Sequence, residues 1–398
     1  MNCFPEKSMK SAECWAAGGS TTGTMFKKLA SFENLLRAYK MCLRRKRNTV
    51  AARAIEPVYE TVLWKLKREL DQGIWRPMPY RAFAVSEPCL REIFAADFSD
   101  RIVHHALYQI INPLFEARFI SQSYACREGK GTHLAVKELR SAMRAAAAGG
   151  REVWFLKMDI KSFFMSIDKD LLMGIIARTI KDSAVLRLIG TIVYTDPAKN
   201  AVKTGNTALL KSVPPQKSLF GAPPGLGLPI GNLTSQLFAN VYLNDLDIFV
   251  KKVLRAKHYF RYVDDFIILD HSPKRLAVFK KRINGFLKNV LWLELHKQKT
   301  FIAPSANGID FLGYFVKPDY VLARRKVVCR LKNKLREFER QKAAPKTILP
   351  VLNSYYGHFK HANSYRLRES VFKNLPARLK NSLTAKSDFL SLRLIAKV

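Results

Sequence analysis

The spacing of hydrophobic and polar residues along the chain predicts a mixture of helices and strands. Apolar residues recur three and four positions apart, the period of an amphipathic helix, at residues 31–44, 58–70, 98–112, 135–148, 169–194, 233–250 and 274–290. Shorter apolar runs, typical of strands, lie at residues 75–98, 153–158, 258–270 and 294–316. Helical spacing returns at residues 327–342 and 347–363 and from residue 365 onward. This order of elements predicts an α+β fold.

Capping residues indicate where two of these helices begin. Ser31 precedes the first helical segment as its N-cap. Thr132 is the expected cap of the segment AVKELRSAMRAAAA, and the Gly-Lys-Gly turn before it could touch phosphate, although most such turns are only turns. Residues 195–226 show neither period and are longer than a compact domain needs, so this loop is either functional or a tolerated insertion.

The most informative segment is HYFRYVDDFIILD, residues 258–270, in which two apolar runs flank Asp264 and Asp265. It predicts a β-hairpin with both carboxylates at its turn. A lone Asp-Asp pair is most often an ordinary solvated turn. A separate strand, however, delivers Asp159 to its end, and carboxylates that are brought together repel each other unless cations hold them. The acids therefore predict a divalent metal site.

The charge of the chain is the one feature of its composition that indicates a class of partner. The 398 residues include 68 Lys and Arg against 32 Asp and Glu, a net charge of +36. Such an excess indicates a polyanionic partner, and nucleic acid is the expected one. From residue 317 onward the chain has 20 Lys and Arg against 5 Asp and Glu, which favours a surface that follows a nucleic-acid backbone.

The cysteines and the apolar segments exclude several other classes. The six cysteines show no CxxC or Cys/His spacing, which argues against a disulfide framework and a structural zinc site. No stretch approaches 18 apolar residues, and the N-terminus does not read as a signal peptide. We therefore expect a cytoplasmic protein with no membrane association.

Two motifs resemble those of reverse transcriptases. YVDD, residues 262–265, matches the YxDD box, and MDIKSFF, residues 158–164, matches the first catalytic box. The resemblance extends from about residue 32 to residue 365 and implies a right-hand polymerase with fingers, a palm containing an antiparallel sheet, and a helical thumb. The expected domains are a flexible leader at 1–24, N-terminal helices and fingers at 25–150, a palm at 151–316, and a basic helical thumb and C-terminal tail at 317–398.

The resemblance also implies roles for individual residues. Two Mg²⁺ ions, which Mn²⁺ can replace, are expected on Asp159, Ile160, Asp264 and Asp265, with the three aspartates catalytic. Lys299 is expected to protonate the leaving pyrophosphate. The residues implied in dNTP binding are Arg91, Phe164, Ile230, Gly231 and Gln236, with Phe164 as the aromatic gate against a ribose 2′-hydroxyl. Those implied in primer or template binding are Tyr262, Phe311, Leu312, Gly313, Tyr314, Arg127 and Lys130.

One departure from the family pattern suggests a subfamily. Most reverse transcriptases have QGxxxSP before the YxDD box, whereas residues 230–236 read IGNLTSQ. This swap is similar to the enzymes of diversity-generating retroelements, which copy a template-repeat RNA into cDNA with frequent errors at adenines. That resemblance implies template RNA, primer, cDNA and dNTPs as partners, together with a small basic accessory protein.

Other interpretations stay open at this point. The chain could be another bacterial reverse transcriptase, from a group II intron, a CRISPR array or an abortive-infection system. It could also be a catalytically inactive RNA-binding scaffold with the same fold, or an enzyme of untemplated terminal transfer.

Overall fold

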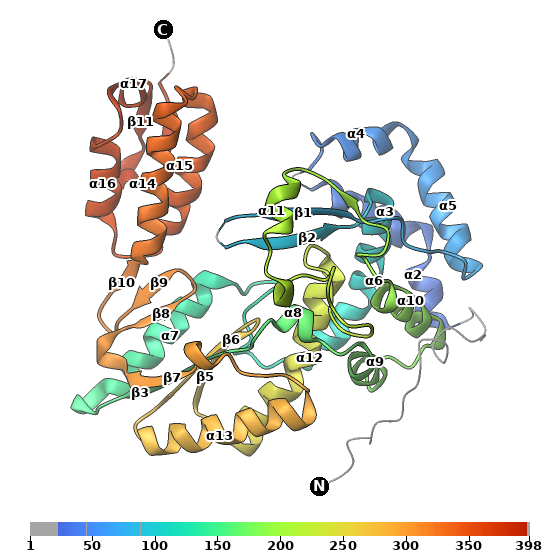
Figure 1. Cartoon of the computed structure of the whole chain (residues 1–398), viewed down its shortest axis with the longest axis horizontal. Coiled ribbons are helices and arrows are strands. Elements are labelled where there is room, and N and C mark those ends of the chain that lie inside the picture. Colours follow the sequence, from blue (N-terminus) through green and yellow to red (C-terminus); the bar gives the residue numbers. More distant parts are fainter. Residues whose placement is uncertain (1–22, 45, 88, 396–398) are drawn as a thin grey trace.

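The computed structural model describes residues 23–44, 46–87 and 89–395. Helices and a small sheet formed by the N-terminal part lie on one side, a larger sheet lies in the middle, and a bundle of C-terminal helices stands at the other end (Figure 1). Most of the predicted leader lies outside the described residues, and its last residue, Thr24, already begins helix α2. The arrangement is α+β, as the spacing predicts.

The central sheet carries the segment that the sequence singles out. It consists of β3 (Trp154–Asp159), β5 (His258–Tyr262), β6 (Asp265–Asp270) and β7 (Phe301–Pro304). The strand order is β5-β6-β3-β7, and all neighbours are antiparallel. The register places Asp159 opposite Asp265, which in turn lies opposite Tyr262. The predicted hairpin and the strand that ends at Asp159 therefore form as adjacent strands of one sheet.

Both faces of this sheet are buried. Successive side chains of a strand point to opposite faces, and each face packs against a different core. On β3, Leu156 belongs to the largest core, whereas its neighbour Phe155 belongs to a second core. The largest core includes α12 (Leu233–Ile248) and α13 (Pro273–Val290). The second core includes α7 (Thr132–Ala147). This double burial explains why the strands read as nearly continuous apolar runs.

The N-terminal helices pack into the largest core. Their bounds are α2 (Thr24–Leu29), α3 (Phe32–Leu43), α4 (Val50–Ile55), α5 (Tyr59–Asp71) and α6 (Phe98–Glu116), with the 3-10 turn η1 (Glu56–Val58). Ser31 caps α3 as predicted, and its hydroxyl accepts from the amide of Asn34 at 3.2 Å. The predicted end of α6 at residue 112 is wrong, because the helix continues through Pro113. Burial of Phe115 in the core outweighs the single amide donor that proline lacks.

A small sheet beside these helices joins β1 (Arg81–Val85) to β2 (Arg91–Ala95) and β4 (Val202–Lys203). The segment 195–226 is therefore not all loop, since it also contains α11 (Thr207–Lys211) and η3 (Pro215–Lys217). Its end is fixed to β2, where the buried Glu92 accepts from the Ser218 hydroxyl at 2.6 Å and the Leu219 amide at 2.8 Å.

Short helices connect the larger elements. These are α8 (Phe163–Ser166), α9 (Lys169–Ala177), α10 (Ser183–Tyr194), η2 (Ala148–Gly150), η4 (Phe249–Val253), η5 (Lys297–Lys299), η6 (Ser305–Asn307) and η7 (Ser387–Phe389). The helical run predicted at 169–194 is thus two helices, and Asp182 caps the second. At α7 the predicted cap is wrong, because Gly131 holds the N-cap position with φ +125° and Thr132 is already helical.

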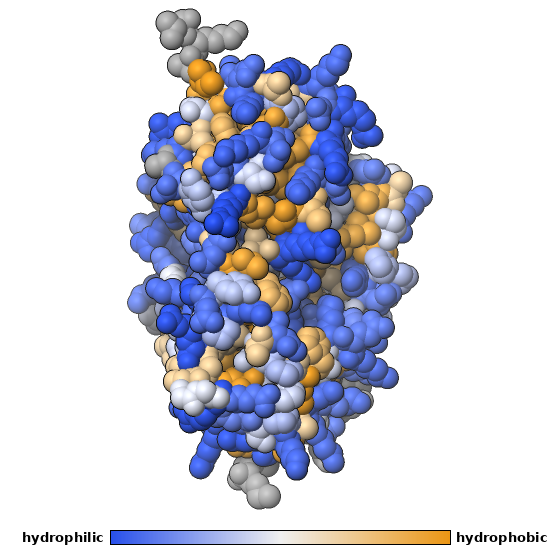
Figure 2. All heavy atoms as spheres, turned by 90° about the vertical axis from the view of Figure 1, so that its left-hand side faces the viewer, coloured by the Kyte–Doolittle hydropathy of each residue, from blue (hydrophilic) through white to orange (hydrophobic). Residues whose placement is uncertain are grey.

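The C-terminal part combines a small sheet with a separate helical core. The sheet is β8 (Ile309–Phe311), β9 (Tyr314–Val316) and β10 (Val321–Ala323), and the helices are α14 (Arg325–Arg340), α15 (Pro345–Phe359), α16 (Tyr365–Lys373) and α17 (Ala377–Lys380). A hairpin of β11 (Leu383–Ala385) and β12 (Leu392–Leu394) was not predicted. Figure 2 shows this side of the molecule, where hydrophilic side chains predominate with apolar patches between them.

Candidate active site

The β5–β6 turn brings the predicted acids to one edge of the central sheet. Val263 and Asp264 form the turn, and Asp265 begins β6 opposite Asp159. Val263 has φ +56°, a left-handed conformation that a β-branched residue rarely adopts. The amide of Ile160 donates to the carbonyl of Asp264 at 3.2 Å and so joins the turn to the end of β3. The three carboxylates therefore lie on two adjacent strands and on the turn that precedes one of them.

Two lysines pair with these carboxylates. The Nζ atom of Lys299 lies 3.0 Å from each carboxylate oxygen of Asp159. The Nζ atom of Lys157 lies 3.6 Å from the carboxylate of Asp265. Lys157 was not predicted as a site residue, although it stands two positions before Asp159 and therefore on the same face of the strand.

Burial makes the two acids of the turn hard to ionise. Burial, and after it the charge of Asp159, raises the pKa of Asp264 to about 6, against the opposing charges of Lys299 and Arg91. Burial also raises the pKa of Asp265 to about 6, although Lys157 opposes that change. In addition, the Oδ1 atom of Asp265 is buried without a hydrogen-bond partner. The environment favours a further cation beside these carboxylates.

The donor set fits a divalent metal ion in its chemistry. As the side chains stand, no three His, Cys, Asp or Glu residues among those described lie close enough to hold one. The unpartnered oxygen of Asp265 and the raised pKa values are nevertheless what hard oxygen donors show when a cation completes the site. Asp159, Asp264 and Asp265 would hold the metal. Ile160 could contribute only its main-chain oxygen, since its side chain is apolar and buried.

The raised pKa values predict a pH-dependent stability when divalent cations are chelated. A carboxyl with a folded pKa above its unfolded value holds more protons in the folded state, so stability falls as pH rises from about 4 to about 6. Asp264→Asn/Asp265→Asn removes both groups. We expect this variant to melt a few degrees above the wild type at about pH 8 and at nearly the same temperature at about pH 4.

Thermal unfolding of both proteins, with and without divalent cation, measures this difference. The cation should raise the Tm of the wild type at high pH and leave that of the variant unchanged. A Tm difference that is the same at every pH would contradict the assignment of these two groups.

Several residues predicted for dNTP binding lie on β2, on α8 or in the segment bonded to both. Arg91 is exposed at the start of β2, and its charge reaches Asp264, whose pKa it lowers against the effect of burial. The carbonyl of Phe164 accepts from the amide of Leu228 at 2.8 Å. The carbonyl of Ile230 accepts from the amide of Phe94 in β2, also at 2.8 Å. These two hydrogen bonds join the segment that contains Ile230 to both α8 and β2.

Gly231 is required by this close approach. It has φ +133°, and a Cβ atom at this position would lie 2.7 Å from the carbonyl oxygen of Phe94. Glycine alone avoids both the strain and the clash. Gln236 lies five residues further on, exposed on α12, so the structure ties its helix but not its side chain to this cluster.

Four of the residues predicted to bind primer or template, residues 311–314, form the turn between β8 and β9 and the strand ends on either side of it. Leu312 and Gly313 are the turn residues, both with positive φ, between the paired Phe311 and Tyr314. Tyr314 is buried and points away from solvent: its hydroxyl donates to the carbonyl of His358 in α15 at 2.8 Å.

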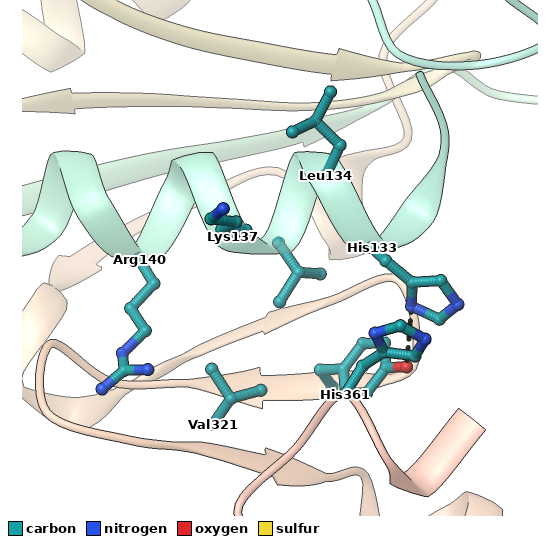
Figure 3. Close-up of a pocket in the computed structure, with 8 residues that line it drawn as sticks. His133, Leu134, Lys137, Arg140, Val321 and His361 are labelled. Carbon is teal, nitrogen blue, oxygen red and sulfur yellow. Dashed lines mark hydrogen bonds between the residues drawn. The ribbon is translucent and has the colours of Figure 1, made fainter. Parts of the chain in front are cut away.

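The Tyr314 hydroxyl also lies 3.1 Å from Nδ1 of His133 at the start of α7. Figure 3 shows this contact at one end of a hollow between α7 and β10, where His133 stacks on His361 with ring centroids 3.6 Å apart. The phenol of Tyr314 therefore joins α7 to the C-terminal helices. The part of this turn that faces outward is the half-buried pair Leu312 and Gly313.

Tyr262, which is also predicted to bind primer or template, is half-buried beside α7. The hydroxyl of Thr132 donates to its phenol oxygen at 3.3 Å. Through this contact the start of α7 touches β5, the strand that leads into the turn of Val263 and Asp264.

Two other residues predicted to bind primer or template are not brought to this site. The guanidinium of Arg127 pairs with Glu116 at 2.6 Å, and its side chain is only 6% exposed. Lys130 donates to the carbonyl of Ser121 at 3.1 Å and lies over the ring of Tyr124. Both side chains hold the chain around residues 116–130 together, and the structure does not present Arg127 to a nucleic acid.

Comparison with known proteins identifies the family. Residues 90–316, more than half of the chain, match the family model described as reverse transcriptase (RNA-dependent DNA polymerase). The chain belongs to the reverse transcriptase family. The matched residues of this reverse transcriptase include all three aspartates and the whole central sheet, and the predicted fold class, an α+β right-hand polymerase, is confirmed.

Individual relatives of this reverse transcriptase are distant. Protein YkfC of Escherichia coli (strain K12) is 25% identical over 284 residues, which cover 63% of this chain and 69% of that protein. Group II intron-encoded protein LtrA of Lactococcus lactis subsp. cremoris is 24% identical over 323 residues, covering 65% of this chain but only 50% of LtrA. Among solved structures, telomerase from Candida albicans in complex with a TWJ fragment of telomeric RNA has a TM-score of 0.45 and 11% identity, covering 75% of this chain and 55% of that chain.

Family membership supports the general expectations about ligands. Reverse transcriptase domains copy template RNA and use divalent metal ions. Within the part of the chain that the structure describes, no helix is both long and apolar enough to cross a membrane.

Proposed function

We propose that this reverse transcriptase is of the diversity-generating retroelement type, and copies a template-repeat RNA into cDNA with frequent errors at adenines. The observation that carries the proposal is the sequence IGNLTSQ at residues 230–236, together with its place in the fold. The carbonyl of Ile230 is fixed to β2, which also bears Arg91, and the preceding Leu228 is fixed to Phe164. Ile230, which replaces the glutamine of most reverse transcriptases, thus stands among the residues proposed to hold the incoming nucleotide.

The chemistry proposed for the site follows from its charges. Two divalent ions, proposed to be Mg²⁺, would supply Lewis-acid activation of a primer 3′-hydroxyl and would offset the charge of the leaving pyrophosphate. Asp159, Asp264 and Asp265 are the residues that would hold these ions. The ammonium of Lys299, 3.0 Å from the carboxylate of Asp159, is the proposed donor of a proton to the leaving pyrophosphate. Arg91, at the start of β2, supplies positive charge for the triphosphate.

A second candidate function is that of a group II intron enzyme. The similarity to LtrA favours it, because LtrA is named as a group II intron-encoded protein. The two candidates are distinguished by their product, because only the first is proposed to make cDNA with substitutions concentrated at template adenines. Sequencing the cDNA that the purified protein makes on a defined RNA, with and without a candidate accessory protein, distinguishes them. Uniformly low error at all four template bases would overturn the retroelement proposal.

Restoring the family residue at position 230 should make the enzyme more accurate. A glutamine side chain at this position can form a hydrogen bond near the nascent base pair, whereas Ile230 cannot, so the variant regains one check on pair geometry. We expect Ile230→Gln to lower misincorporation opposite adenine by about tenfold, the scale on which one polar contact discriminates. The measurement is the error spectrum of cDNA made on the same RNA.

A matched control for this prediction is Ile230→Val, which keeps the position apolar. It should preserve the error spectrum of the wild type. Unchanged adenine errors in Ile230→Gln would remove residue 230 from the mechanism of infidelity while leaving the polymerase assignment intact.

The N-terminal helices carry a candidate surface for binding RNA away from the three aspartates. A hollow of about 730 Å³ beside α3 is lined by several cations and by no acidic side chain: Arg37, Lys40, Arg44, Lys46 and Arg47. A surface of one sign attracts the phosphates of a structured RNA. It would repel a basic accessory protein, so we propose that RNA, and not the accessory protein, occupies it.

A further inference from the structure

A buried ion pair lies directly beneath the turn of Val263 and Asp264, the proposed catalytic turn. Arg261 of β5 and Asp247 of α12 both have fully buried side chains. Nε of the arginine donates to Oδ1 of Asp247 at 2.7 Å, and Nη2 donates to Oδ2 at 2.6 Å. This bidentate geometry fixes the plane of the guanidinium, which a single contact would leave free to turn.

The remaining donors of the guanidinium are also used. Nη1 donates to Oδ1 of Asn240 at 3.2 Å and to the carbonyl of Val263 at 3.1 Å. Nη2 donates in addition to the hydroxyl of Ser123 at 2.9 Å. Each of the five N–H groups of Arg261 therefore has an acceptor, and one of those acceptors belongs to the catalytic turn.

That acceptor is the strained residue of the turn. Val263 has φ +56°, at the position where hairpin turns favour glycine. Its carbonyl belongs to the peptide that joins it to Asp264, so a hydrogen bond to this oxygen sets the direction in which the next residue leaves the turn. A β-branched residue keeps such a conformation only where its surroundings enforce it.

The network is anchored on both sides of the arginine. Asp247 also accepts from the hydroxyl of Tyr259 at 2.7 Å. Asn240 donates to the carbonyl of Ala125 at 2.8 Å, and the amide of Tyr124 donates to the carbonyl of Arg261 at 3.0 Å. The turn is thus held against α12, the helix that begins just after residues 230–232, and not only against its neighbouring strands.

We propose that Arg261 is a positioning residue: with Asp247 it holds the carbonyl of the strained Val263, and so places the Asp264 carboxylate for nucleotidyl transfer. The inference rests on the proposed catalytic role of Asp264. A buried ion pair is weak evidence for stability, because apolar replacements of the whole pair are often neutral. The need to hold the turn in its geometry explains the Arg261–Asp247 pair better than a contribution to stability does.

The test removes both charges together, so that no charge stays buried alone. In Arg261→Met/Asp247→Asn the amide still accepts from Tyr259, but the donor to Val263 is lost. We expect a folded protein with unchanged RNA affinity, a kcat for single-nucleotide addition lowered about tenfold or more, and little change in KM for dNTP.

Adding Val263→Gly to this variant should restore most of the lost kcat, because glycine adopts positive φ without support. A merely structural arginine would not be rescued in this way. Arg178→Met/Asp245→Asn is the matched control: it removes an Arg–Asp pair from the outer side of α12, with a 2.7 Å contact, and should leave kcat unchanged. If the first double variant does not fold, Arg261→Lys keeps the charge opposite Asp247 without the five-donor fork, and the same loss and rescue are expected.

Two results would overturn the proposal. One is a folded variant without the Arg261 donors that extends primers as fast as the wild type. The other is a slow variant that Val263→Gly fails to rescue. Failure of the underlying assignment is distinguishable, since an active Asp264→Asn enzyme would remove the catalytic role of Asp264 itself, whatever Arg261 does.

Discussion

Asp264→Asn is expected to abolish DNA synthesis while RNA binding is retained. The amide has nearly the same shape as the carboxylate, so the hairpin and its pairing with β3 should survive. It lacks the negative charge that would hold a divalent ion between the turn and Asp159. Losing one electrostatic stabiliser of a transition state lowers rates on the order of 1,000-fold. Primer extension on an RNA template measures the rate, and filter binding measures RNA affinity.

Asp270→Asn provides the matched control. Asp270 is the last residue of the same strand, β6, at the end far from the turn. Its carboxylate lies 3.4 Å from Arg275. This variant loses a charge from the same strand but should extend primers at the wild-type rate. Equal loss of synthesis in both variants would mean that strand stability, and not the site, is being measured.

Phe164→Ala is expected to relax the choice of sugar. Phe164 is half-buried on α8, directly after β3, and its carbonyl is fixed to the segment leading to Ile230. If its ring excludes a ribose 2′-hydroxyl by contact, an alanine removes that contact. We expect use of ribonucleotides relative to deoxynucleotides to rise about 10- to 100-fold, with deoxynucleotide incorporation slowed far less.

Single-nucleotide incorporation with matched dNTP and rNTP pairs measures this ratio. Phe164→Tyr keeps a ring of the same width and should stay selective. An alanine variant that still rejects ribonucleotides as strongly as the wild type would show that sugar choice lies elsewhere.

Local patterns in the sequence sufficed for the parts of the site that lie on one strand or turn. The apolar runs around Asp264 and Asp265 predict the hairpin. These runs are nearly continuous because both faces of the two strands are buried. Lys157 could have been found in the same way, since residues two apart share a strand face. The pairing of Asp159 with Asp265 needed the resemblance to a family, because the strands that carry these residues are over 100 positions apart.

Contacts between distant segments explain what could not be predicted. Arg127 resembles a phosphate ligand in a basic, glycine-rich turn, but Glu116 lies opposite it only after α6 has continued past Pro113. The insertion at 195–226 looks like a free loop until its Ser218 hydroxyl meets the buried Glu92. The domain boundaries and the cytoplasmic location stay predictions, although β10 pairs with β9 across the expected boundary at residue 317.

The order of strands in the central sheet has a consequence for amide exchange. β3 and β6, which carry the aspartates, are the two inner strands, and each is bonded along both edges. Inner strands release their amide protons only when the whole sheet opens, whereas edge strands and short hairpins open singly. We therefore expect the amides of β3 and β6 to exchange more slowly than those of β2, which begins with Arg91, and of β8, which leads into the β8–β9 turn, since both are edge strands of three-stranded sheets.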